Sequence, residues 1–193
     1  MALIVRNFSR KIYLAQIFRV YHSGAFTDLT ITCAGENFKV HKVVVCTQSP
    51  FFNTACSGPW KESQNATVDL AEDDIEVVRR MVEFFYRADY TDFKDEKFTR
   101  HAQVFAIAIK YDIEMLSARA IDKYCEAALK YWDPSAFLRS IHTVYLHTPE
   151  QMRGLRIRVI DQARRHYESF DDPSKWPGIK HLWRETCVQV LPR

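Results

Sequence analysis

The spacing of apolar and polar residues changes several times in the first 70 positions of the chain. Over 9–22 the apolar residues recur at helical spacing, which predicts a helix. Residues 28–33 and 36–40 alternate between apolar and polar side chains and are separated by an Ala-Gly pair. This pattern predicts a strand hairpin with one buried face, and the alternation over 66–70 predicts a third strand.

Two short helices are predicted between the hairpin and the third strand. The spacing becomes helical from Lys42 onward. Pro50 cannot donate a backbone hydrogen bond, so the first helix has to end before it. Ser49 is a favourable N-cap and Pro50 a favourable first position for the second helix, which carries Phe51 and Phe52.

The pattern stays helical from about residue 73 onward. Asp73 and Glu76 have the spacing of a capping box at the start of the first of these helices. Residues 101–113 are apolar almost all round, which predicts a central buried helix. The next helix has an apolar stripe of Ile121, Tyr124, Cys125, Ala128 and Leu129, and another helix is predicted over 133–147. The last stripe consists of Met152, Leu155, Val159, Ala163 and Tyr167.

This order of elements predicts an α+β fold. A small, mostly three-stranded sheet is capped by a cluster of helices, and extra helices follow toward the C-terminus. The length of 193 residues fits one domain with an appended piece.

The composition excludes several classes of protein. A hydrophobic content of 47% with 13% aromatic residues is not that of a disordered chain. No apolar run approaches the roughly 20 residues of a membrane span, and the start lacks a signal-peptide pattern, so we expect a soluble cytoplasmic or nuclear protein. Five scattered cysteines without a CxxC pair and seven dispersed histidines lack metal-ligand spacing. We therefore expect free thiols, no metal and no cofactor.

The net charge of +3 arises from the C-terminal part of the chain. The last 61 residues carry 10 basic and 7 acidic side chains, whereas residues 1–132 carry 17 of each. Such a bias is typical of a solvated helix face or of a phosphate-binding surface. Three surplus charges are a weak footprint, so nucleic acid is not the expected partner. A transcription-associated or nucleic-acid-associated role remains the alternative function.

The dipeptide His41-Lys42 stands where the strand pattern changes to a helical one. A catalytic His41 would need a nucleophile such as Cys46, and a third group to orient it. No Gly-rich loop for an oxyanion lies near it in the sequence. The pattern therefore favours a structural histidine that satisfies backbone groups at the joint, and it predicts no enzymatic activity.

Several motifs together resemble the BTB (POZ) domain. They are Asp28 at the start of the first core strand, the joint Val40-His41-Lys42, the turn Ser49-x-Phe51-Phe52, the run Lys61-Glu62-Ser63, and the segments "VRRMVEFFYRADY" and "FAIAIKYDI". They occur in the family's order over about residues 20 to 130. The chain most resembles the short BTB proteins of filamentous fungi, although Arg87-Ala88 replaces the usual Thr-Gly.

The resemblance implies a division into three parts. An N-terminal segment with a dimerisation-type helix spans 1–22, the BTB/POZ domain spans 23–130, and a helical extension spans 131–193. It also implies a non-catalytic module that homodimerises and presents a surface to other proteins. In some BTB families that surface binds a cullin scaffold, so that the protein serves as a ubiquitin-ligase substrate adaptor.

The helix over 9–22 carries more apolar surface than one packed face needs, which requires a second partner. In BTB dimers the corresponding helix packs against its two-fold mate. The expected interface residues are Ile12, Tyr13, Leu14, Ile17, Phe18, Tyr21, Asp28, His41 and Lys42, with Asp28 and Lys42 in a charged pocket implied by the resemblance. Residues 2–5 fit either an exchanged edge strand or a disordered start.

The resemblance places a partner surface of the cullin-binding type at Phe51, Tyr86, Tyr90 and Asp92. Met81 and Phe85 nearby have core spacing, and a solvated loop would explain the charges after Tyr90 equally well. Over 133–169, a helical cap on the domain competes with a basic recruiting surface. The apolar periodicity favours the cap.

Overall fold

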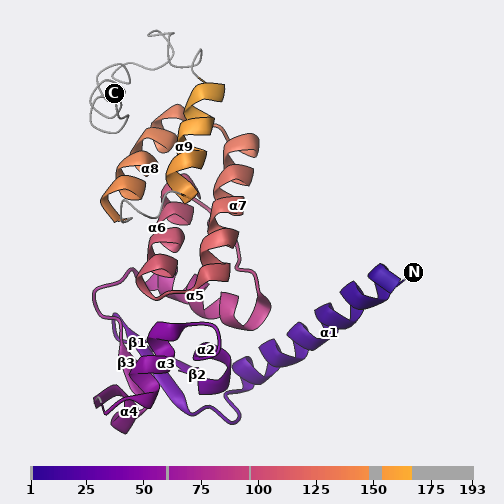
Figure 1. The fold of residues 1–193 in the computed structure, drawn as a ribbon, viewed down its shortest axis with the longest axis vertical. Coiled ribbons are helices and arrows are strands. Elements are labelled where there is room, and N and C mark those ends of the chain that lie inside the picture. Colours follow the sequence, from indigo (N-terminus) through magenta and orange to yellow (C-terminus); the bar gives the residue numbers. More distant parts are fainter. Residues whose placement is uncertain (1, 60, 96, 148–153, 167–193) are drawn as a thin grey trace. The chain divides into compact units, whose positions relative to one another are not determined.

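The computed structural model describes residues 2–59, 61–95, 97–147 and 154–166. Within these residues the chain forms three strands and nine helices (Figure 1). They belong to two compact units. Unit 1 contains Met1–Thr91 and Ile107–Leu116, and unit 2 contains Asp92–Ala106 and the chain from Ser117 onward.

Unit 1 is built on a three-stranded sheet with β1 (Leu29–Cys33) in its centre. Strand β2 (Glu36–Val40) runs antiparallel to β1, and β3 (Thr67–Asp69) pairs in parallel with the other edge of β1. The register sets Ile31 opposite Phe38, and both side chains are buried on the same face. The predicted hairpin and third strand are confirmed.

Two short helices follow the hairpin, as predicted. They are α2 (Lys42–Val45) and α3 (Pro50–Ser57). The Ser49 hydroxyl accepts the Phe52 N–H at 3.1 Å and donates to the Tyr111 carbonyl at 2.6 Å. This serine therefore caps α3 and also attaches it to a distant part of unit 1.

Helix α4 (Lys61–Asn65), which the pattern did not predict, precedes β3. Helix α5 (Ile75–Arg87) then starts at a different cap from the predicted one. Asp74, not Asp73, accepts two backbone N–H groups of the first helical turn. The predicted capping box is wrong because the Asp73 carboxylate binds the ammonium of Lys110, at 2.9 Å, and the hydroxyl of Tyr111.

Helix α5 ends at Ala88, whose φ of 53° lies in the left-handed region. A side chain with a Cβ costs roughly 1–2 kcal/mol in that region, whereas glycine adopts it freely. We expect Ala88→Gly to raise the free energy of unfolding by about 1 kcal/mol and the Tm by about 2–4 °C. In thermal unfolding, Ala118→Gly at an exposed helical position should lower stability by about 0.5–1 kcal/mol. Equal effects of both substitutions would contradict the prediction.

Helix α1 (Ala2–Ser23) is a single helix that begins before the predicted range of 9–22. Residues 2–5 belong to it, so the exchanged edge strand considered for them is wrong. The C-terminal half of α1 packs against α5 through ring contacts. Figure 1 shows the N-terminal half extending away from the sheet of unit 1.

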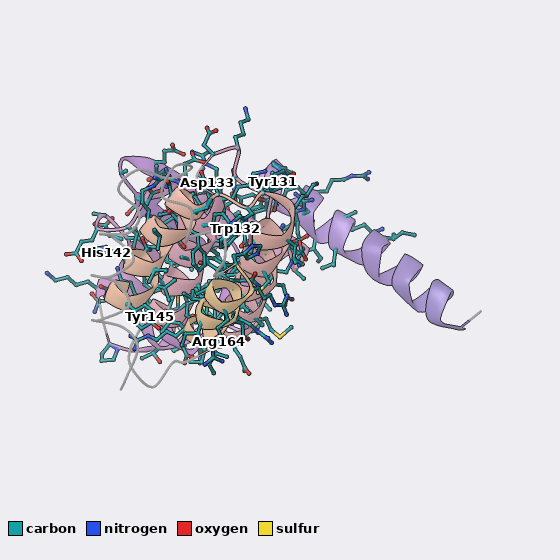
Figure 2. The ribbon with its side chains drawn as sticks, turned by 90° about the horizontal axis from the view of Figure 1, so that it is seen from above. Tyr131, Trp132, Asp133, His142, Tyr145 and Arg164 are labelled. Atoms are coloured by element: carbon teal, nitrogen blue, oxygen red, sulfur yellow. The ribbon has the colours of Figure 1, made fainter. Side chains whose placement is uncertain are left out.

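Unit 2 is helical. It takes residues from α6 (Lys97–Lys110), α7 (Glu114–Lys130), α8 (Pro134–His147) and α9 (Gly154–Arg165). In its core the ring of Phe98 lies 5.6 Å from that of Tyr124 and 6.1 Å from that of Phe137. Trp132, which Figure 2 labels, lies between α7 and α8. Its ring stacks on that of His166, just after α9, with centroids 3.6 Å apart.

The apolar stripes predicted for α7 and α9 are confirmed in part. The structure buries Tyr124, Ala128, Leu155 and Val159. Leu129 is instead 71% exposed, because Ala127 and Ala128 take the inward positions of the last turn. Met152 and Tyr167 lie outside the described residues. The predicted α+β class, with a three-stranded sheet and helices after it, is confirmed.

Candidate protein-interaction site

His41 is buried at the joint between β2 and α2, with 7% of its surface exposed. Its Nδ1 lies 2.8 Å from the Tyr86 hydroxyl, and its Nε2 lies 2.8 Å from the Ala25 carbonyl oxygen. The His41 backbone N–H donates to the same hydroxyl at 2.9 Å. Cys46, the nucleophile considered for it, directs its Sγ to the Phe52 carbonyl. This geometry supports the structural interpretation of His41 and leaves its ring little surface for contact with a second chain.

Asp28 completes the same joint from the start of β1. Its Oδ1 accepts the backbone N–H of Lys42 at 2.7 Å, and its own N–H donates to the Val40 carbonyl. Asp28 thus caps α2, since the His41 side chain makes no capping bond. The carboxylate contacts the backbone of Lys42, and the place of these two residues in a dimer interface stays a prediction.

Two aromatic residues of α1 predicted for the interface pack inside unit 1. The ring of Tyr21 stacks on that of Tyr86 with centroids 4.6 Å apart. The Arg87 guanidinium lies 5.2 Å from the centre of the Phe18 ring. Phe18 and Tyr21 are therefore half-buried and position α1 on α5.

Other apolar side chains near the N-terminus of unit 1 remain exposed. Ile12 is 46% exposed, Val20 36%, Phe26 90% and Val43 70%, and these four residues are called the N-terminal apolar surface below. Leu14 and Ile17 are half-buried, and the side chain of Tyr13 lies outside the description. This surface comes from α1, the loop after it and α2.

Phe26 is held in an unfavourable backbone conformation. Its φ of 62° is left-handed, which is rare for a bulky residue. The residues on either side of it are bound to the start of α2, Ala25 through His41 and Asp28 through Lys42. The loop therefore presents an aromatic ring to solvent close to the helix that carries Val43.

A pocket of about 620 Å³ opens beside α3, α4, β3 and the C-terminal end of α6, all within unit 1. It is lined by Pro50, Phe51, Thr54, Ala55, Glu62, Val68, Asp69, Lys110 and Asp112, and is called the Phe51 pocket below. Phe51 is 40% exposed, and its ring packs on Phe52 and Tyr111. Because the ammonium of Lys110 is paired with Asp73, the three acidic residues of the lining dominate its charge.

Two residues predicted for the partner surface are core residues instead. Tyr86 is 0% exposed and Tyr90 2% exposed, so neither ring can touch another protein without unfolding. Burial also raises the pKa of the Tyr86 hydroxyl, which stays protonated beside His41. Asp92 is exposed, as predicted, and its carboxylate binds the ammonium of Lys123. Of the four residues predicted for the partner surface, only Phe51 lines the Phe51 pocket.

Two of the four basic residues of α9, Arg156 and Arg158, have partners within unit 2. Arg156 lies over the ring of Tyr145, 4.7 Å from its centre, and Arg158 pairs with Asp161 at 3.8 Å. Buried Leu155 and Val159 form the inner side of this helix. These contacts pack α9 within unit 2, and the helical cap on the domain stays a prediction.

The model of the BTB/POZ domain family matches residues 18–128. The chain belongs to the BTB/POZ family. This BTB domain is therefore a protein–protein interaction module, and its strand–helix joint and ring-packed α5 lie inside the matched range. None of the helices formed by the described residues combines the length and apolar character needed to cross a membrane.

Relatives of this BTB chain include mouse proteins. TD and POZ domain-containing protein 3 of Mus musculus is 22% identical over 165 residues, which cover 86% of this chain and 42% of the mouse protein. TD and POZ domain-containing protein 2 of Mus musculus is 23% identical over 164 residues, which cover 83% of this chain and 42% of that protein. The chain thus spans less than half the length of these relatives. The likeness to short fungal BTB proteins stays a prediction.

Proposed function

We propose that this BTB protein acts without catalysis, as a homodimer that presents a second surface to a cullin-type scaffold and so serves as a ubiquitin-ligase substrate adaptor. The observation that carries the dimer is the N-terminal apolar surface, with Phe26 90% and Val43 70% exposed. The loop that carries Phe26 is bound to the start of α2, which carries Val43, and large apolar side chains exposed close together favour a protein partner.

A second copy of the chain fits this surface better than an unrelated protein. A two-fold contact covers the same patch on both subunits at once, so the apolar side chains of one subunit meet those of the other. The N-terminal half of α1, which extends away from the sheet of unit 1 in Figure 1, gives such a contact additional length. An obligate dimer buries roughly 2,000 Å² or more, an area that α1, the Phe26 loop and α2 would supply together.

Val43→Asp tests the dimer. Val43 is exposed in the single subunit, so the substitution leaves the fold intact, but an unpaired charge in the interface should weaken dimerisation about 100-fold or more. We expect light scattering at several concentrations to give a dimer for the natural protein and a monomer for the variant. Leu129→Asp, at a comparably exposed site in unit 2, should remain dimeric. A natural protein that is monomeric at about 100 µM would overturn the dimer.

The Phe51 pocket supports the second half of the proposal. It combines a half-exposed aromatic ring with three acidic residues, Glu62, Asp69 and Asp112. A partner helix that inserts an apolar side chain between basic neighbours would match both properties. The pocket is separate from the N-terminal apolar surface in its residues, so a dimer can present two such pockets.

Phe51→Asp tests the partner surface. We expect it to weaken binding of a recombinant cullin N-terminal domain about 10- to 100-fold in calorimetry, as loss of a buried aromatic anchor does. Dimerisation should be unchanged, and Leu129→Asp should bind like the natural protein. Failure of the natural protein to bind any cullin would refute the adaptor role and leave the dimer to its own test.

A further inference from the structure

Cys46 and Cys56 meet between α2 and α3. The Sγ of Cys46 lies 3.6 Å from the Phe52 carbonyl oxygen. Cys56 follows Phe52 by four residues in α3, and a helical side chain leans toward the preceding turn, so its thiol lies on the same side of the helix. The thiol of Cys56 is near enough to that of Cys46 to raise the pKa of the Cys46 thiol.

The other described cysteines are placed differently. Cys33 is fully buried in β1, and its thiol donates to the Asp73 carbonyl at 3.3 Å. Cys125 lies in α7, in unit 2. Cys46 and Cys56 are both free and partly exposed, so a small reagent can reach the thiol pair.

We propose that Cys46 and Cys56 form a two-electron redox site, which a low-molecular-weight disulfide oxidises to an intramolecular disulfide bond. This inference does not depend on the proposed dimer or on the cullin partner. It rests on the placement of both thiols beside the Phe52 carbonyl and on the partial exposure of the two residues.

The reaction runs through a mixed disulfide. The Cys56 thiolate attacks one sulfur of the reagent RSSR, the S–S bond of the reagent breaks, and RS⁻ leaves and takes up a proton. Cys46 then loses its proton and attacks the Cys56 sulfur, so the bond between Cys56 and RS breaks and a second RSH is released. The two protein thiols are oxidised by two electrons, and RSSR is reduced to two RSH.

The order of attack follows from the surroundings of Cys46. Burial, and after it the neighbouring Cys56 thiol, raises the pKa of Cys46 to about 12, so the Cys46 thiol keeps its proton and is a poor first nucleophile. Cys46 is therefore the resolving thiol, and its step is the slower one. The disulfide would connect the end of α2 with the last turn of α3, next to Ala55 in the Phe51 pocket.

The experiment uses the reduced full chain and an excess of oxidised glutathione, followed by acid quenching, alkylation and peptide mass spectrometry. We expect a glutathione adduct on Cys56 at early times, and then a chain without glutathione that has lost two hydrogens because Cys46 and Cys56 are linked. Cys46→Ser should stop at the adduct on Cys56. Cys125→Ser, the matched control, should form the bond at the natural rate.

Three results would overturn the inference. The natural protein would stop at an adduct on Cys56, or Cys56 would pair with another cysteine, or Cys56→Ser would leave the rate of Cys46 modification unchanged. A parallel sample in urea tests whether the fold selects the Cys46–Cys56 pair. In the unfolded chain, disulfide bonds between other cysteines should form as well.

Discussion

Replacing Tyr86 with alanine is expected to lower the free energy of unfolding by about 3–5 kcal/mol, as removal of a fully buried aromatic ring does. Tyr86 is 0% exposed, and its ring supports Tyr21 of α1. Its hydroxyl also accepts the His41 N–H and contacts the imidazole. One side chain therefore connects α5 to both α1 and the strand–helix joint.

Tyr86→Phe separates the two contributions. It keeps the ring but leaves the buried His41 N–H without its acceptor, which should cost about 1–3 kcal/mol. Urea unfolding of the natural protein and both variants measures the difference. If Tyr86→Ala costs less than about 1 kcal/mol, Tyr86 is a surface residue and not part of the core.

Acidification from pH 7 to pH 4 is expected to cost about 3 kcal/mol of stability through His101 alone. This histidine of α6 is 2% exposed, and burial is the main reason that its pKa falls to about 4. Asp92 acts in the opposite direction, while Lys123, Lys97 and Arg119 lower the pKa further. The folded chain therefore rejects a proton that the unfolded chain accepts.

The sign of the effect follows from proton uptake. Above the ordinary histidine pKa of about 6.5 neither state binds the proton, so the contribution of His101 to stability is complete. Between about 6.5 and 4 the unfolded chain is protonated first, and stability falls as the pH falls. Below about 4 both states bind the proton, and this loss levels off.

Unfolding in urea at several pH values between 7 and 4 checks the prediction. The variant His101→Gln removes the titrating group, so its stability should fall less steeply than that of the natural protein. His142→Gln, on the exposed side of α8, is the matched control and should keep the natural slope (Figure 2). If the free energy of unfolding falls equally steeply with pH in His101→Gln and in the natural protein, His101 is not the group responsible.

The sequence predicted those elements whose determinants are local. The alternation on both sides of Ala34-Gly35 was sufficient for the hairpin, because a two-residue turn leaves one register that buries Ile31 and Phe38 together. Ser49 and Pro50 likewise determine the start of α3 by their own backbone chemistry. The family motifs added the strand–helix joint, in which His41 has the predicted structural role.

The failures come from contacts between residues far apart in the chain. Tyr86 lies in the last turn of α5, where Tyr21 and His41 contact it from distant segments. Tyr90 lies in the loop after the helix, and both rings are buried. Asp73 could not be excluded as the cap of α5, because Lys110 and Tyr111 bind it from 37 and 38 residues away. The left-handed backbone of Phe26 has no signal in its residue type either.

The Phe51 pocket shows the same limit more strongly. Its lining comes from α3, α4, β3 and the end of α6, four segments that share no periodic pattern. Among the lining residues, the resemblance identified only Phe51 as part of a partner surface. A concave site of this kind follows from the topology of the sheet, which a one-dimensional pattern does not contain.

The parallel pairing of β3 with β1 also sets an order of assembly. The β1–β2 hairpin closes through a short turn within microseconds, because its contacts are local. The pairing of Thr67 with Thr30 is a non-local contact and forms more slowly. We expect β3 to dock late, and to be among the first segments to detach in transient openings of the native fold. Since Val68 and Asp69 form one wall of the Phe51 pocket, any occupant of that pocket has to slow amide exchange in β3.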